Sequence, residues 1–113
     1  MTTFNRGDVV YIPFEFTDRG KLKNRPGVVI SSTAFHESRR DVVIAGITSN
    51  LNREHFVGHL VLGHWAECGL VKPSAISGII QTIRDSQVRQ RIGSLSSHDQ
   101  IRLDAMLREV LGL

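Results

Sequence analysis

The order of apolar segments along the chain constrains its fold more than any other feature of the sequence. Short β-rich runs come first, and they read DVVYIPFEF, PGVVISSTAF, DVVIAGITS, HFVGHLVLG and GLVKPSAISGIIQTI. Helical spacing of apolar residues is clear only near the end, between Ile101 and Leu111. Ser97, with Gln100 three residues later, predicts a capping box there, and Gly93 supplies a break before it. The pattern predicts an α+β domain, a small barrel of short strands followed by a C-terminal helix.

Length and composition narrow the class of protein. The 113 residues predict a single domain, residues 1–113, with one modest core. A net charge of +3 is a mild basic bias, compatible with a polyanionic partner. One cysteine, Cys68, excludes an internal disulfide and suits a reducing compartment. The first residues show no signal-peptide pattern and no apolar run reaches membrane-spanning length, so we expect a cytoplasmic protein with no membrane partner.

Two polar segments separate the first strands. TDRGKLKN, residues 17–24, is rich in charge and predicts a mobile loop. HESRR predicts a hairpin turn around His36 and Glu37, joining strands at residues 26–33 and 41–48. This hairpin would place Val28 opposite Ala45 and Ile30 opposite Val43, apolar against apolar.

The same register places Arg25 opposite Thr48 at the open end of the hairpin. Directly opposed residues of an antiparallel pair lie roughly 5 Å apart at Cβ. A guanidinium offers a planar fork of donors that suits a phosphate, and the hydroxyls of Thr48 and Ser49 can position a phosphate oxygen. When the 2′-hydroxyl of RNA attacks the adjacent phosphate, the protein has to transfer protons and stabilise charge, and no metal is required. An alternative stays open: Arg25 as a solvated strand-end charge and Thr48 as an ordinary strand residue.

Several segments together resemble a known family. They are GDVVYIPFEFTDRGKLKNRPGVVIS near the start, ITSN at residues 47–50, GLVKPSAI at 69–76, IIQTI at 79–83 and GSLSSHDQIRLDAMLREVLGL at 93–113. In this order they resemble the PemK/MazF toxins of type II toxin–antitoxin systems. The resemblance covers nearly the whole chain, and its separated blocks make it far more specific than any single one.

The resemblance implies a CcdB/PemK/MazF-like fold, an SH3-like β-barrel of about five to seven short strands with a C-terminal helix. It also implies a homodimeric endoribonuclease that cleaves single-stranded RNA without a metal or other cofactor and is restrained by an acidic antitoxin. The expected products are a 2′,3′-cyclic phosphate and a 5′-hydroxyl. Arg25 matches the family's catalytic arginine, and Thr48 matches its catalytic hydroxyl residue.

The expected RNA-binding residues belong mostly to the segment from Thr17 to Asn24, which matches the loop that covers the RNA groove. They are Arg19, Lys21, Lys23, Asn24, Ser49 and Lys72. For Lys72, a solvated lysine is an equally good interpretation. Gly78-Ile79 stands where many relatives carry Asp-Gln, which removes an acidic group and leaves the general base open.

That departure keeps two other functions open. One is a CcdB-like toxin that binds gyrase, although the Arg-Pro and Thr-Ser signatures argue against it. The other is a barrel that binds nucleic acid or a partner with weakened catalysis.

His55, His59 and His64, with Cys68 behind them, raise the question of a metal site. Residues four apart on a strand lie roughly 13 Å apart, too far to share a zinc ion. A helix would bring His55 and His59 together and keeps a metal site as an alternative, but surface histidines and no metal are the better interpretation. Trp65 is expected in the core or at a dimer interface, and Cys68 as a small buried apolar group.

Overall fold

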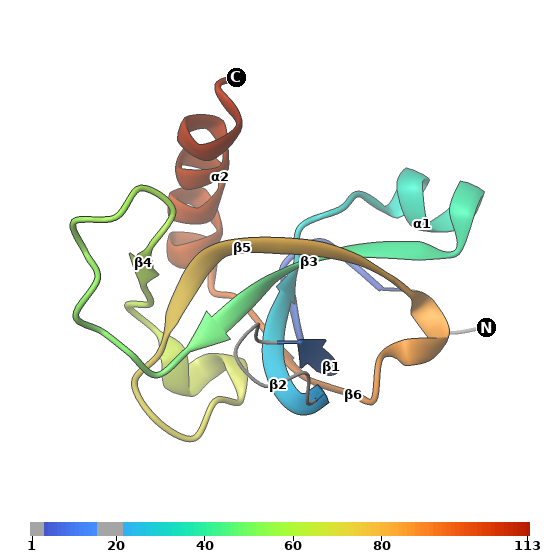
Figure 1. Cartoon of the computed structure of the whole chain (residues 1–113), viewed down its shortest axis with the longest axis horizontal. Helices are drawn as coiled ribbons and strands as arrows, with labels where there is room; N and C mark the ends of the chain where they lie inside the picture. The colour runs from blue at the N-terminus through green and yellow to red at the C-terminus, as the bar shows by residue number, and fades with distance from the viewer. Residues whose placement is uncertain (1–3, 16–21) are drawn as a thin grey trace.

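Six strands form one antiparallel sheet in the computed structural model, which describes residues 4–15 and 22–113 (Figure 1). The strands are β1 (Asp8–Glu15), β2 (Leu22–Val29), β3 (Asp41–Thr48), β4 (Leu60–Val61), β5 (Ala75–Arg84) and β6 (Gln90–Ser94). Their order across the sheet is β4-β5-β3-β2-β1-β6. The helices are α1 (Thr33–Arg39) and α2 (Ser97–Leu111), with 3-10 turns η1 (Trp65–Cys68) and η2 (Asp85–Gln87).

The sheet buries apolar side chains on both faces because successive residues of a strand point to opposite sides. On one face Val9, Val28 and Ala45 stand in one row across β1, β2 and β3, and Leu103 and Leu107 of α2 pack in the same cluster. The other face carries a second buried cluster, formed by Phe4, Val10, Ile12, Val29, Val42, Ile44 and Ile83. This arrangement confirms the predicted α+β fold, a curled sheet with a C-terminal helix.

The predicted register between the second and third strands is confirmed. Val28 pairs with Ala45, flanked by Gly27 opposite Gly46 and by Val29 opposite Ile44. One step further, the N–H of Ile30 donates to the carbonyl of Val43 at 2.9 Å. The apolar match of the two runs therefore set their pairing.

The hairpin turn predicted around His36 and Glu37 is wrong, because helix α1 occupies this segment. Ser32 caps the helix by accepting a hydrogen bond from the N–H of Phe35 at 3.2 Å. His36 is buried, with Nδ1 2.9 Å from the carbonyl oxygen of Phe4 and Nε2 within hydrogen-bond distance of the Ser31 hydroxyl. The helix can therefore bury its histidine, because both ring nitrogens of His36 have a partner in the interior.

Two further segment predictions need correction. The loop expected at residues 17–24 ends earlier, since Leu22 already pairs with Glu15 in the sheet; its residues 17–21 lie outside the described residues. HFVGHLVLG contributes only the two residues of β4. Gly58, with φ +96°, interrupts the run before β4, in a conformation that only glycine adopts easily.

The C-terminal helix is confirmed, but its start differs from the prediction. Ser96 is the N-cap rather than Ser97, and its hydroxyl accepts a hydrogen bond from the N–H of Asp99 at 3.1 Å. Gly93 is not a break: it lies in β6 and pairs with Val9 of β1. A Cβ at Gly93 would come within 2.3 Å of the Cys68 carbonyl oxygen, so glycine lets η1 close over this end of the sheet.

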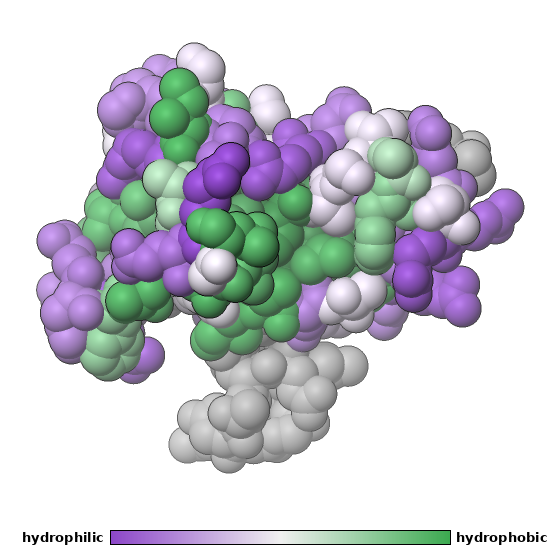
Figure 2. Space-filling view, turned by 90° about the horizontal axis from the view of Figure 1, so that it is seen from above, coloured by the Kyte–Doolittle hydropathy of each residue, from purple (hydrophilic) through white to green (hydrophobic). Residues whose placement is uncertain are grey.

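Apolar side chains are also found on the surface. Figure 2 shows them gathered in the middle of the face seen from above, between more hydrophilic ends. Large exposed apolar residues are Phe56, Val57, Val71, Ile79, Ile101, Leu111 and Leu113. Trp65 is only half-buried and packs on the first core cluster, whereas Cys68 is buried as predicted. No helix in the described part of the chain is long and apolar enough to cross a membrane.

Candidate functional site

Arg25 and Thr48 lie on the neighbouring strands β2 and β3, just beyond the point where their pairing ends. The last pair of this ladder is Gly27 with Gly46, and each candidate residue stands two positions further along its strand. Arg25 is exposed and pairs with Ile12 of β1, whereas Thr48 is half-buried as the last residue of β3. The structure thus places Arg25 within β2 and Thr48 at the end of β3, on the side where the two strands stop pairing, and the direct facing of Arg25 and Thr48 stays a prediction.

The end of β3 is shaped by an irregular pairing with β5. Ala45 pairs with Ile80 and Ile47 with Ile76, so Ser77, Gly78 and Ile79 all stand opposite Gly46. The Ser77 hydroxyl donates to the Gly46 carbonyl oxygen at 3.1 Å and fixes this bulge. Bulges bend a strand and re-aim its side chains, and they are common beside active sites.

A cavity of about 260 Å³ opens beside Thr48. It is lined by Ile47, Thr48, Asn50, Arg53, His59, Ser77 and Ile79. Thr48 Oγ1 accepts a hydrogen bond from the N–H of Asn50 at 3.1 Å, which leaves the hydroxyl proton to donate to a ligand. The Thr48 side chain can therefore contact an anionic oxygen placed in or near this cavity.

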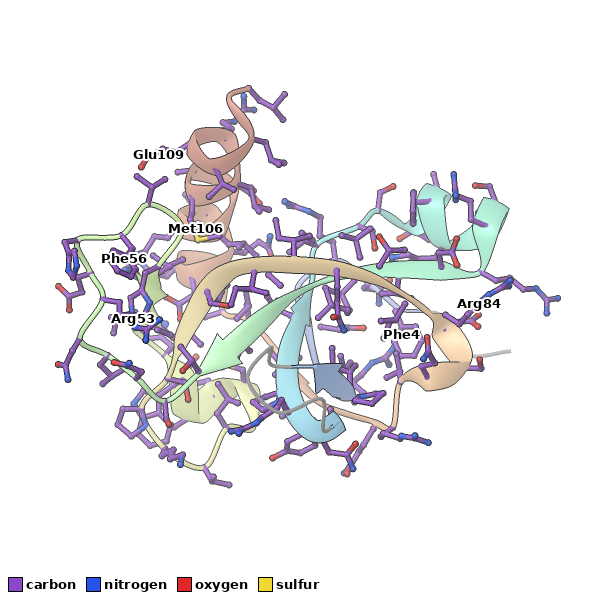
Figure 3. All side chains as sticks on the ribbon, viewed as in Figure 1. Phe4, Arg53, Phe56, Arg84, Met106 and Glu109 are labelled. Atoms are coloured by element: carbon purple, nitrogen blue, oxygen red, sulfur yellow. The ribbon has the colours of Figure 1, made fainter. Side chains whose placement is uncertain are left out.

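The wall of the cavity comes from the connection between β3 and β4. Figure 3 shows Arg53 and Phe56 on this connection, on the side of the molecule where α2 stands, and the Arg53 guanidinium lies 5.8 Å from the centre of the Phe56 ring. Gly58 packs against β5: a Cβ on it would come within 3.0 Å of the Gly78 Cα. Two glycines thus let the connection approach the bulge where many relatives are expected to carry Asp-Gln.

The structure describes some of the other predicted RNA-binding residues and not the rest. Arg19 and Lys21 lie outside the described residues, and of Lys23 the structure describes only its backbone, paired with Phe14. Asn24 is exposed on β2 beside Arg25, and Ser49 is exposed directly after Thr48. Lys72 is exposed shortly before β5, whose first residue, Ala75, pairs with Thr48. Asn24 and Ser49 are therefore the exposed chain neighbours of the two catalytic candidates.

The histidines between β3 and η1 do not form one group. His55 is exposed beside Phe56, and His64 is exposed with Nδ1 2.9 Å from the Ser96 hydroxyl. His59 is half-buried, so the prediction of surface histidines is wrong for this residue. Burial raises the pKa of the Cys68 thiol. Across residues 4–15 and 22–113, no three His, Cys, Asp or Glu side chains are grouped to hold a metal ion.

The sequence prediction did not assign Asn50, Arg53 or His59 to the site. They follow Thr48 in an irregular segment, where neither strand periodicity nor helical spacing indicates which side chains turn toward the cavity. Only the position of Asn50, directly after the Thr-Ser pair, signalled its proximity.

A second cavity, of about 550 Å³, lies apart from this site. It is bounded by α1 and the C-terminal end of α2, and its lining includes Arg6, Ile30, Phe35, Leu107, Leu111 and Leu113. The two cavities share no lining residue, so the larger one adds nothing to the chemistry at Thr48.

The sequence of residues 5–111 matches the family model described as PemK-like, MazF-like toxin of type II toxin–antitoxin system. The chain belongs to this family. The match confirms the resemblance drawn from the sequence blocks and makes this protein a toxin of a type II toxin–antitoxin system, with an antitoxin as its partner. No curated protein matches the sequence at a significant level.

Solved structures with the same fold support the assignment. A mycobacterial endoribonuclease has a TM-score of 0.77 at 18% identity, covering 100% of this chain and 95% of its own. The Mycobacterium tuberculosis toxin MazF-mt6 has a TM-score of 0.74 at 20% identity, with 94% and 97% covered. A MazE–MazF structure from Deinococcus radiodurans has a TM-score of 0.75 at 15% identity, with 100% and 99% covered. At these identities the similarity shows that the toxin shares their fold.

Proposed function

We propose that this toxin is a metal-independent, sequence-specific endoribonuclease that cleaves single-stranded messenger RNA and thereby inhibits growth. The observation that carries the proposal is that Arg25 lies within β2 and Thr48 at the end of β3, neighbouring strands whose pairs up to Gly27 and Gly46 have the register expected from the apolar pattern. Similar structures named as endoribonucleases share the fold and agree with this assignment.

The proposed reaction is an internal transesterification of RNA. The 2′-hydroxyl loses its proton, its oxygen forms a bond to the adjacent phosphorus, and the bond from phosphorus to the 5′-oxygen breaks. The leaving 5′-oxygen takes up a proton, so the products are a 2′,3′-cyclic phosphate and a 5′-hydroxyl, and no water is consumed. Proton transfer and stabilisation of charge on the phosphoryl oxygens are the two tasks left to the protein.

Arg25 and Thr48 suit the second task. The exposed guanidinium of Arg25 is always charged and donates to two phosphoryl oxygens in one plane. The Thr48 hydroxyl, oriented by the Asn50 N–H, donates to a phosphoryl oxygen from the neighbouring strand. Donors held in place before the reaction stabilise developing charge without a cost of reorganisation.

The same edge suits an acidic antitoxin segment. Arg19, Lys21, Lys23 and Arg25 follow closely in sequence, and Asp18 is the one acidic residue nearby, so they attract a flexible polyanion. A disordered acidic tail that pairs with these cations would compete with RNA for the site. Neutralisation then needs no chemistry, only occupation of the edge that carries Arg25.

We also propose that the toxin acts as a two-fold symmetric homodimer. Ile101, Leu111 and Leu113 are exposed on or after α2, and Phe56 and Val57 are exposed on the connection beside it. A small domain rarely leaves this much apolar side chain in water unless a partner covers it. Trp65 contributes less than expected, because it packs on its own core cluster. A monomer in light scattering at micromolar concentration would contradict the dimer.

The activity is tested with purified toxin and single-stranded RNA in the presence of EDTA. The expected result is cleavage, with cyclic phosphate on one fragment and a free 5′-hydroxyl on the other. Activity that disappears with chelator and returns with a divalent ion would contradict the mechanism. If RNA stays intact under every condition, co-purification with gyrase separates a gyrase-binding toxin from a barrel that only binds RNA.

A further inference from the structure

The cavity beside Thr48 contains side chains that the proposed chemistry does not use. Asn50, Arg53 and His59 line it from the connection between β3 and β4, and Ile79 of β5 lines it too. Ile79 is 52% exposed, so it gives the cavity an apolar wall that is open to a ligand. The question is which ligand combines contacts with all four.

His59 supplies the most specific clue. Its Nε2 is shielded from solvent and has no hydrogen-bond partner among the described residues. The residue itself is fixed, because its backbone N–H donates to the Phe56 carbonyl at 3.2 Å. Buried polar atoms are almost always paired, and an unpaired one destabilises a protein until a ligand or a small turn of the ring satisfies it. A bound molecule with a hydrogen-bonding edge would supply that partner.

The neighbouring groups indicate what kind of molecule it is. Asn50 Oδ1 accepts the N–H of Asn52 at 3.0 Å, which leaves the Asn50 amide NH₂ to donate. Arg53 adds a planar cation, and Ile79 adds an apolar surface. Flat surfaces with a few donors and acceptors at the rim are how proteins hold the unstacked bases of single-stranded RNA.

We propose that this cavity binds the base of a nucleotide next to the cleaved phosphate and that His59 contacts the edge of that base. The inference rests on the proposed function and deepens it, because it assigns a residue to sequence preference. Thr48 lines the same cavity, so a phosphate held by its hydroxyl leaves the attached nucleotide within reach of His59. The resulting contact discriminates among bases by hydrogen bonding rather than by charge.

The position of the wall depends on the two glycines described above. Gly58 and Gly78 meet backbone to backbone, with ideal Cβ positions only 3.0 and 3.3 Å from the opposite Cα. Side chains at these positions would push the β3–β4 connection away from β5 and move His59 relative to Thr48. The cavity therefore depends on glycine at both positions.

The decisive experiment compares cleavage-site preference among variants. Wild type, His59→Ala and His55→Ala are each given a pool of single-stranded RNA with randomised sequence, and the new 5′-hydroxyl ends are sequenced. We expect His59→Ala to lower the preference at one position beside the cut by roughly tenfold, the effect of losing one hydrogen bond. His55→Ala is the matched control, since His55 is exposed on the same connection and lines no part of the cavity.

Two results would overturn the inference. One is an unchanged preference in His59→Ala. The other is an equal loss of rate at every site, which indicates a role in chemistry or stability instead of recognition. Circular dichroism of each variant identifies loss of the fold. If His59→Ala does not fold, the RNA ends produced by His59→Asn, which keeps a smaller hydrogen-bonding side chain, are sequenced instead.

A binding measurement separates this inference from the proposed activity. Short 2′-O-methyl homo-oligonucleotides of each base cannot be cut at their own 2′-oxygen, so they report binding alone. With ¹⁵N-labelled histidine, we expect the ring signals of His59 to shift more for one base than for the others while those of His55 stay in place. If the wild-type protein shows this shift but fails to cut RNA, the base-binding subsite is supported and the proposed activity is rejected. Cleavage without any base-dependent shift at His59 rejects the subsite alone.

Discussion

The carboxylate of Asp99 accepts a hydrogen bond from the backbone N–H of Gly63 at 3.0 Å, so the first turn of α2 holds the segment that follows β4. The same carboxylate accepts from the N–H of His64 and from the Arg102 guanidinium, both at 2.9 Å, and it is fully buried. An anion at this end of a helix is also favoured by the helix dipole. Asp99 therefore connects the segment after β4 to α2 through one side chain.

Asp99→Ala should lower the free energy of unfolding by about 3 kcal/mol, because two backbone N–H groups and a guanidinium lose their buried acceptor. Urea denaturation measures the change. Asp104→Ala is the control, since Asp104 is 45% exposed and its ion pair with Arg6 should contribute no more than about 1 kcal/mol. Equal effects of the two substitutions would contradict the role given to Asp99.

Acid should destabilise the toxin partly through Asp99. Burial by itself would raise the pKa of this carboxyl, but the hydrogen bonds from Gly63 and His64 and the nearby Arg102 outweigh it and lower the pKa. A carboxyl with a lowered pKa in the folded state stabilises the fold above its ordinary pKa, about 3.9, and this contribution is lost as the pH falls through the folded-state pKa. Between pH 5 and strongly acidic solution, stability of Asp99→Asn should therefore fall less steeply than that of wild type. Parallel curves from urea denaturation would show that other carboxylates dominate.

Arg25→Ala and Thr48→Ala should each abolish most RNA cleavage without loss of the fold. Losing a charge-assisted contact to a transition state costs on the order of 3 kcal/mol, which is over a hundredfold in rate. Thr48→Ser keeps the hydroxyl and should retain more activity than Thr48→Ala. Rates are compared for variants with wild-type circular dichroism, and near-normal cleavage by both alanine variants would mean that the active site lies elsewhere.

Gly58→Ala should lower the stability of the fold more than Gly112→Ala does, although both glycines have a positive φ, +96° and +71°. At Gly112 a Cβ meets nothing within 4 Å, so only backbone strain of about 1 kcal/mol is expected. At Gly58 a Cβ would lie 3.0 Å from the Gly78 Cα and 3.1 Å from Val110 Cγ2, which should bring the loss to at least about 2 kcal/mol. Thermal unfolding of the two variants side by side tests the difference, and similar stabilities would show that the β3–β4 connection yields easily.

The parts of the fold that the sequence predicted are those set by repeated apolar contacts. The pairing of Val28 with Ala45 could be predicted because a shift of one residue would turn every apolar side chain of the run to the wrong face. The helix that carries Leu103 and Leu107 could be predicted because several apolar residues recur there at helical spacing. The same register predicts that Arg25 and Thr48 face one another, two residues beyond the last observed pair, Gly27 with Gly46.

The parts that the sequence did not predict depend on single contacts between distant residues. Helix α1 is short, and its buried residue is His36, which is accommodated only because Phe4 and Ser31 supply partners. Strand β6 contains one apolar residue, Ile92, and is defined by its pairing with β1. The cavity at His59 likewise depends on how closely Gly58 approaches Gly78, which no local pattern of residues reports.

The place of β1 in the sheet has a consequence for the toxin as it leaves the ribosome. One edge of β1 is taken by β2, which follows it in the chain, but the other is taken by β6, near the opposite end. During synthesis that second edge stays open until Ser94 has emerged, and Leu103 and Leu107 arrive later still to cover the core. The nascent toxin therefore has β1, β2 and β3 in place long before its sheet can close, and the open edge of β1 is exposed to other chains during that interval.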